Sequence, residues 1–156
     1  MPPCFDVYVW VRTGDRPAVL SQFIDRYVDA EHPGEPRFDA FVRTFIAREP
    51  APGDLDALAE LRRDTYAAEA FALYLRAKAH YGAIITLTEE GDLVLGLSLD
   101  DPNNDPETMH RASGLRASLT EEFGARGGVA GAELPPPQSA SEWKEDGLVM
   151  LRVGSV

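Results

Sequence analysis

The fold is decided by the segment Phe5-Asp6-Val7-Tyr8-Val9-Trp10-Val11. Valine occupies every second position, which is the repeat of a β-strand, and Thr13-Gly14 ends the pattern. One face of this strand therefore carries the valines, and the other carries Asp6, Tyr8 and Trp10. We expect a strand over residues 5–11 whose valine face lies against helices.

A second strand pattern lies in the middle of the chain. Leucine recurs at positions 93, 95, 97 and 99, and the polar segment 88–92 separates this run from Ile85 and Leu87. The spacing predicts a β-hairpin over residues 83–99. Its leucines should share a helix-covered face with the valines of the first strand. A last strand is expected over residues 148–153.

Four other segments repeat apolar residues at helical spacing. The expected helices cover residues 16–30, with Asp15 as the N-cap, and residues 38–46, 55–80 and 107–123. This order predicts the α+β class, with an antiparallel or mixed four-stranded sheet, a ferredoxin-like β-α-(α-α)-β-β-α-β order and extra helices. No linker divides the sequence, so we expect a single globular α+β domain over residues 1–156.

The expected second helix has an apolar stripe that needs a surface to bury against. Phe38, Phe41 and Phe45 lie on this stripe. We expect the helix to cover the sheet face that carries Tyr8 and Trp10. Covering these rings would keep them from stacking on the bases of a nucleic acid.

Composition and charge limit the possible partners. The 156 residues include 15 basic and 26 acidic side chains, which gives a formal charge of −11. This charge repels a phosphate backbone, so nucleic acid is not expected as a partner. It attracts a cation or a basic protein, although acidity also serves solubility alone.

Cysteine content and hydropathy indicate the compartment. Cys4 is the only cysteine, so no disulfide can form within the chain. No segment has the pattern of a secretory leader or the length of a membrane span. We therefore expect a cytoplasmic protein that binds no membrane.

Motifs of common enzyme classes are absent from the sequence. It contains no Gly-x-Gly-x-x-Gly, no P-loop, no His-Glu-x-x-His and no Gly-x-Ser-x-Gly. The histidines at positions 32, 80 and 110 have no spacing that makes two of them neighbours. We assign no catalytic residue, no metal ligand and no cofactor, and the sequence favours a protein that is not an enzyme.

Two polar segments are candidates for binding. The acidic edge contains Asp100, Asp101, Asn103 and Asp105, whose oxygens suit a hard cation but equally suit the capping of a helix. The proline strap, residues 135–143, contains Pro136, Gln138 and Trp143. Three consecutive prolines make it extended, and it serves either as a binding segment or as a strap that holds Trp143 on the core.

Topology predicts where these segments meet. If the first strand and the second hairpin strand are parallel neighbours, Asp15, the acidic edge and the proline strap converge at one edge of the sheet. The candidate binding residues are then Asp15, Asp100, Asp101, Asn103, Asp105, Pro136, Gln138 and Trp143.

Two functions remain open. The leading hypothesis is a non-catalytic acidic protein-binding domain, of inhibitor, immunity or adaptor type, that engages a basic partner. The alternative is an enzyme or sensor that binds a small molecule or a divalent cation at the Asp100–Asp105 edge. A pocket lined by Arg16, His110 and these carboxylates would favour the alternative.

Overall fold

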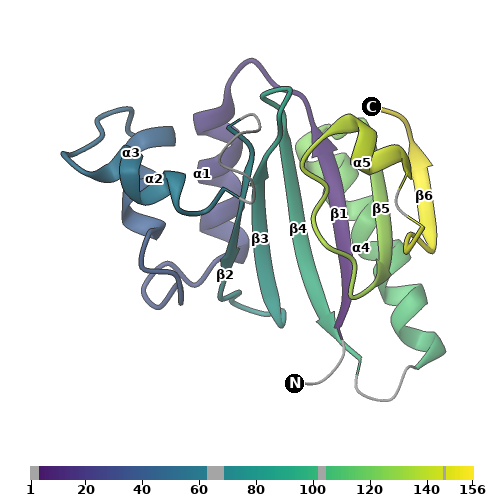
Figure 1. Ribbon diagram of the computed structural model, residues 1–156. Coiled ribbons are helices and arrows are strands. Elements are labelled where there is room, and N and C mark those ends of the chain that lie inside the picture. Colours follow the sequence, from purple (N-terminus) through teal and green to yellow (C-terminus); the bar gives the residue numbers. More distant parts are fainter. Residues whose placement is uncertain (1–3, 63–68, 102–104, 146) are drawn as a thin grey trace.

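The protein has a six-stranded antiparallel sheet with helices packed on it, as the computed structural model shows (Figure 1). The structure describes residues 4–62, 69–101, 105–145 and 147–156. The strands are β1 (Cys4–Val11), β2 (Phe71–Leu75), β3 (Gly82–Leu87), β4 (Leu93–Asp100), β5 (Gly127–Ala132) and β6 (Leu151–Gly154). The helices are α1 (Arg16–Tyr27), α2 (Phe38–Phe45), α3 (Asp54–Ala59), α4 (Pro106–Phe123) and α5 (Ala140–Glu145). No helix in these ranges is both long and apolar enough to cross a membrane.

The α+β class is confirmed, but the predicted number of strands is wrong. The sheet has six strands in the order β2-β3-β4-β1-β5-β6, where four were expected. The expected helix over residues 55–80 is also wrong, since α3 ends at Ala59 and β2 begins at Phe71. Pairing of β2 with β3 outweighs the helix propensity of this alanine- and leucine-rich run.

β1 lies inside the sheet, and both of its neighbours run antiparallel to it. In the β1–β4 pair Cys4 lies opposite Asp100, and Val11 lies opposite Leu93. The expectation of parallel neighbours is therefore wrong. Because the end of β1 meets the start of β4, the loops that follow these two strands leave from opposite ends of the sheet.

The helix-covered face of the sheet holds the main core, as predicted. Val7, Val9 and Val11 share this core with Leu93, Leu95 and Leu97, and each is almost completely buried. Helices α1, α2, α3 and α4 all contribute apolar side chains to it. Figure 1 shows α1 and α4 on this side of the sheet.

The opposite face is covered by the chain between β5 and β6, and not by α2. Tyr8 and Trp10 are buried as expected, together with Leu134 and Trp143. The rings of Trp10 and Trp143 meet edge to face, with centroids 5.5 Å apart. In Figure 1 the strap and α5 lie in front of β1 and β5, whereas α2 lies beyond β2.

The phenylalanine stripe of α2 packs on the main core instead. Phe41 and Phe45 both contact Phe71 of β2, with ring centroids 6.2 and 5.8 Å apart. The predicted cover for Tyr8 and Trp10 was therefore wrong because β2, which the sequence analysis missed, gives α2 an apolar partner at the edge of the sheet.

Candidate functional site

The predicted binding residues do not converge. Asp15 follows β1 and caps α1, where its side chain accepts a hydrogen bond from the backbone of Ala18 at 3.2 Å. Arg16, beside it, donates to the carbonyl of Gly91 in the β3–β4 turn. Asp100 lies at the opposite end of the sheet, opposite Cys4. The antiparallel pairing of β1 with β4 thus separates the two acidic segments.

At the acidic edge, two carboxylates hold the start of α4. Asp105 is the N-cap and accepts from the backbone of Glu107 at 3.0 Å. Asp101 accepts from the backbone of Asp105 at 2.8 Å and from the hydroxyl of Thr108 at 3.0 Å. The capping role is therefore confirmed. Asp100 is exposed, and Asn103 lies outside the described residues.

In the proline strap, the predicted residues are buried in the fold. Trp143 is 2% exposed and packs on Trp10, and Pro136 and Gln138 are also buried. The carbonyl of Gln138 accepts from the backbone of Glu89, and the backbone of Ala140 donates to the Glu90 carboxylate at 3.2 Å. The strap thus fastens the β3–β4 turn to α5 and supports the reading in which it holds Trp143 on the core.

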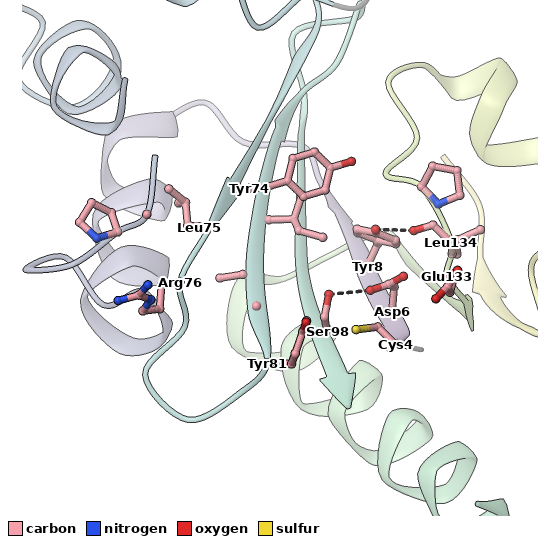
Figure 2. A pocket seen from close by; sticks show the side chains of 16 residues that line it. Cys4, Asp6, Tyr8, Tyr74, Leu75, Arg76, Tyr81, Ser98, Glu133 and Leu134 are labelled. Atoms are coloured by element: carbon pink, nitrogen blue, oxygen red, sulfur yellow. Dashed lines mark hydrogen bonds between the residues drawn. The ribbon is translucent and has the colours of Figure 1, made fainter. Parts of the chain in front are cut away.

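A pocket opens on the sheet face beside the start of this strap, and we call it the sheet pocket (Figure 2). Its volume is about 700 Å³. Side chains from β1, β3 and β4 form its floor, and residues in or beside β2 and residues that follow β5 form its walls. The residues that matter for its chemistry are Cys4, Asp6, Tyr8, Tyr74, Arg76, Tyr81, Ser98 and Glu133.

Asp6 and Ser98 form a polar pair in this floor. The register places them directly opposite each other on β1 and β4, and the Ser98 hydroxyl donates to Asp6 Oδ1 at 2.5 Å. The backbone N–H of Leu134 also donates to the Asp6 carboxylate. Asp6 is only 7% exposed, and it forms no ion pair with any residue in the described ranges.

The environment of Asp6 disfavours its charged form. Burial raises the pKa of the Asp6 carboxyl above its usual value of 3.8, and the negative charge of Glu133 acts in the same direction. The hydrogen bonds from Ser98 and Leu134 oppose this effect without cancelling it. The Asp6 carboxylate is therefore a buried acid that a cation would stabilise.

Tyr8 and Gly96 shape the middle of the pocket floor. They are partners in the β1–β4 register, and a Cβ atom on Gly96 would lie 2.4 Å from the Tyr8 ring. The absence of a side chain at Gly96 therefore lets the ring lie flat across β4. The Tyr8 hydroxyl donates to the carbonyl of Leu134 at 2.5 Å, which fixes the strap as one wall.

The other walls are aromatic and carry one positive charge. Tyr74 is 58% exposed and Tyr81 is 44% exposed, which is unusual for large apolar side chains in this structure. Figure 2 shows Arg76 across the pocket from Asp6 and Glu133. Arg76 has no ion pair within the described part of the chain. Arg76 thus lies apart from the acidic groups, of which Asp6 is on the floor and Glu133 on another wall.

The pocket lining offers little for covalent catalysis. Burial raises the pKa of the Cys4 thiol, and the nearby Asp6, Asp100 and Glu133 raise it further, so the reactive thiolate is disfavoured. The Ser98 hydroxyl donates a hydrogen bond to the Asp6 carboxylate, and no histidine lines the pocket. Over the described ranges, no group of three or more histidine, cysteine or acidic side chains could hold a metal ion.

A second depression lies at the acidic edge, next to Tyr81. It is lined by His80, Asp100 and Arg111 among others, and neither Arg16 nor His110, whose presence would favour the alternative hypothesis, lines it. Burial lowers the pKa of His80, and the positive charge of Arg111 lowers it further. The charged form of His80 is therefore disfavoured, so His80 is not suited to act beside Arg111 as a second positive charge that binds an anion.

Sequence reasoning missed the sheet pocket, although one signal for it was present. Asp6 is a carboxylate in a strand whose other side chains are almost all apolar. Its neighbours Ser98 and Tyr81 could not be found without the β1–β4 and β3–β4 registers. Tyr74 was hidden because its strand was predicted as helix.

Comparison of the chain with protein-family models, with curated proteins and with solved structures gives no match.

Proposed function

We propose that the chain is a non-catalytic acidic protein-binding domain, of inhibitor, immunity or adaptor type, that engages a basic partner through the sheet pocket. The observation that carries the proposal is the combination of exposed tyrosines with buried and exposed carboxylates in one pocket. Of the binding residues predicted from the sequence, Asp15, Asp101 and Asp105 hold helix starts and Pro136, Gln138 and Trp143 are buried in the fold, so none of these six lines the pocket.

The aromatic walls suit a protein partner. Tyrosine is enriched among the residues that dominate binding energy at interfaces, because its ring buries a large area and its hydroxyl accepts or donates a hydrogen bond. Tyr74 and Tyr81 present such rings on either side of an open concavity. A partner side chain that enters the pocket would bury both.

The charge of the chain suits a basic partner. A net charge of −11 attracts positive surfaces over a distance of about one Debye length, roughly 10 Å at 0.1 M salt. Asp6 and Glu133 place negative charge inside the pocket as well, so the pocket and the whole chain both attract a basic group. Such complementarity increases the rate of association more than it slows dissociation.

The test begins with the partner itself. Proteins that co-purify with the wild-type chain are identified, and the most enriched one is purified and titrated against wild-type and Tyr74→Ala/Tyr81→Ala proteins. We expect a basic partner whose association rate falls about tenfold or more between 50 and 300 mM salt. The tyrosine variant should lose at least about tenfold in affinity.

A matched control distinguishes binding at the pocket from nonspecific binding to exposed apolar side chains. Leu55→Ala/Met150→Ala removes two side chains that are 65% and 59% exposed but do not line the pocket. This variant should bind as the wild type does. Equal binding by the tyrosine variant, or binding that salt does not weaken, would show that the proposed function is wrong.

A further inference from the structure

On the basis of this proposed function, we infer that the sheet pocket receives a single arginine side chain of the partner, whose guanidinium pairs with the Asp6 carboxylate on the pocket floor. Glu133 adds attraction from the neighbouring wall, and Tyr74 and Tyr81 flank the inserted side chain.

The first argument is the missing counter-ion of Asp6. A buried carboxylate costs free energy unless a positive charge compensates it, and natural proteins usually supply that charge from within. Here the described residues supply only two hydrogen bonds, from Ser98 and from the backbone of Leu134. A carboxylate has about four acceptor sites, so room remains for a bidentate donor.

The second argument is the preorganisation of Asp6. β-Sheet pairing fixes its backbone between β4 and β5, and Ser98 fixes one carboxylate oxygen. The guanidinium of arginine presents parallel N–H groups that match a fixed carboxylate, whereas the ammonium of lysine is a point charge. A fixed acceptor therefore favours arginine over lysine.

The third argument is the aromatic lining. Guanidinium groups stack on aromatic rings, and tyrosine faces attract cations. The pocket volume of about 700 Å³ lies within the range of clefts that bind a drug-sized ligand, roughly 300–1,000 Å³. It accommodates one long side chain together with part of the backbone that carries it.

Arg76 provides a way to distinguish a partner arginine from the free amino acid. It lies across the pocket from the carboxylates, so a second positive charge would be repelled there. A free amino acid would place its α-carboxylate near Arg76, whereas an arginine within a protein has no such group. The two sources can be separated by blocking the termini of the ligand.

The experiment is an NMR titration of the whole chain with Nα-acetyl-arginine amide. We expect saturable shifts of the backbone signals of Asp6, Tyr81 and Ser98. Nα-acetyl-citrulline amide has nearly the same shape without the charge, and it should bind at least about tenfold more weakly. The affinity of Nα-acetyl-lysine amide should lie between those of the arginine and citrulline derivatives. Equal binding of the arginine and citrulline derivatives would overturn the inference.

Variants locate the binding. Asp6→Asn should weaken the arginine derivative about tenfold or more, and Asp56→Asn is the matched control because it removes the same charge from the exposed surface of α3. Retained dispersion of the amide NMR signals would show that Asp6→Asn is folded. Glu133→Gln is a second variant, for which we expect a smaller loss of affinity for the arginine derivative. Unchanged affinity in Asp6→Asn would also overturn the inference.

The dependence of the affinity on pH tests the role of Asp6 independently. Since a guanidinium binds the ionised carboxylate, affinity should rise as the pH increases through the raised pKa of Asp6 and then become constant. Asp6→Asn should abolish this rise. A wild-type profile that matches the Asp6→Asn profile would contradict a role for Asp6.

Failure of the inference can be distinguished from failure of the proposed function. If the partner binds with the expected salt and tyrosine dependence while the arginine derivative does not bind, the inference alone is wrong. If free arginine binds at least tenfold more tightly than the blocked derivative and Arg76→Ala removes that difference, the pocket is a small-molecule site. That result would overturn both proposals.

Discussion

At the scale of single residues, Asp6 shows how a side chain can reduce the stability of the fold that contains it. Its carboxyl group is buried next to Ser98, and its pKa is raised mainly by that burial. The folded chain therefore holds the Asp6 proton at pH values where the unfolded chain has already released it. Its ionisation then opposes folding at neutral pH.

This effect predicts the behaviour of Asp6→Asn. Between the unfolded pKa near 3.8 and the higher folded pKa, the folded state binds more protons, so the stability of the wild type relative to the variant falls as the pH rises. Asp6→Asn should therefore gain stability relative to the wild type between acid and neutral pH. Urea unfolding of both proteins at several pH values measures this difference. A difference that moves in the opposite direction would show that Asp6 has an internal cation.

Gly96 gives a second prediction at this scale. A methyl group there would overlap the Tyr8 ring, so Gly96→Ala should cost about 1–3 kcal/mol of unfolding free energy through overpacking. Gly82→Ala is the matched control, because a Cβ atom at that strand position meets Ser98 at an ordinary 3.8 Å. Denaturant unfolding of the two variants provides the comparison. Equal costs would mean that the Tyr8 ring does not depend on Gly96 for its place.

At the scale of elements, β4 connects the main core to the pocket floor. Leu95 is fully buried on its helix-covered face, and replacement by alanine should cost about 2–5 kcal/mol by leaving a cavity. Chemical denaturation measures the loss, with the exposed Leu55→Ala as a control that should stay within about 0.5 kcal/mol of the wild type. A loss below about 1 kcal/mol for Leu95→Ala would mean that the facing of β4 is misassigned.

The proline strap and α5 give a prediction about tryptophan exposure. Trp10 is fully buried beneath Trp143, so its emission should remain inaccessible to iodide in Trp143→Phe, which keeps an aromatic cover. Trp143→Ala should lose about 3–5 kcal/mol and leave Trp10 accessible to the quencher. Stern–Volmer measurements on the two variants test this directly. If Trp10 were readily quenched in Trp143→Phe, the strap would not be the cover of this face.

The elements differ in how far the sequence predicted them. β1, the β3–β4 hairpin and the cores of α1, α2 and α4 follow from periodicity alone. β5 could not be found in the same way because it contains Gly127, Gly128 and Gly131, and glycine is depleted in strands. The structure explains all three glycines, because a Cβ atom would meet the Val153 carbonyl at position 127, the Arg116 side chain at position 128 and the Leu148 carbonyl at position 131.

The candidate site was less predictable than the fold. Its residues are brought together by the registers of β1 with β4 and of β3 with β4. Predicting β1 and β4 as parallel was enough to place Asp15 and Asp100 wrongly at the same end of the sheet. Local patterns identify which residues face which side of a strand, but they do not identify the neighbouring strand. The capping role of Asp15, and the use of a carboxylate of the acidic edge to cap the next helix, depend only on local sequence and were predicted correctly.

At the scale of the whole molecule, a charge of −11 raises the question of whether the chain binds divalent cations at a specific site. Asp101 and Asp105 are used to hold α4, so Ca²⁺ or Mg²⁺ at about millimolar concentration should give no saturable increase in melting temperature. Thermal unfolding over a range of cation concentrations tests this. A saturable increase that Asp101→Asn abolishes would instead support a cation site at the acidic edge.

The central place of β1 has a consequence for how the chain folds during its synthesis. β1 is synthesised before its neighbours β4 and β5, although Phe5 pairs with Leu99 and with Ala132. At about 5–20 residues per second, β5 emerges on the order of ten seconds after β1. Until then Val7, Val9 and Trp10 form an apolar segment without its strand partners. Nascent chains should therefore expose the β1 segment to chaperones, and refolding should be slow for a domain of this size.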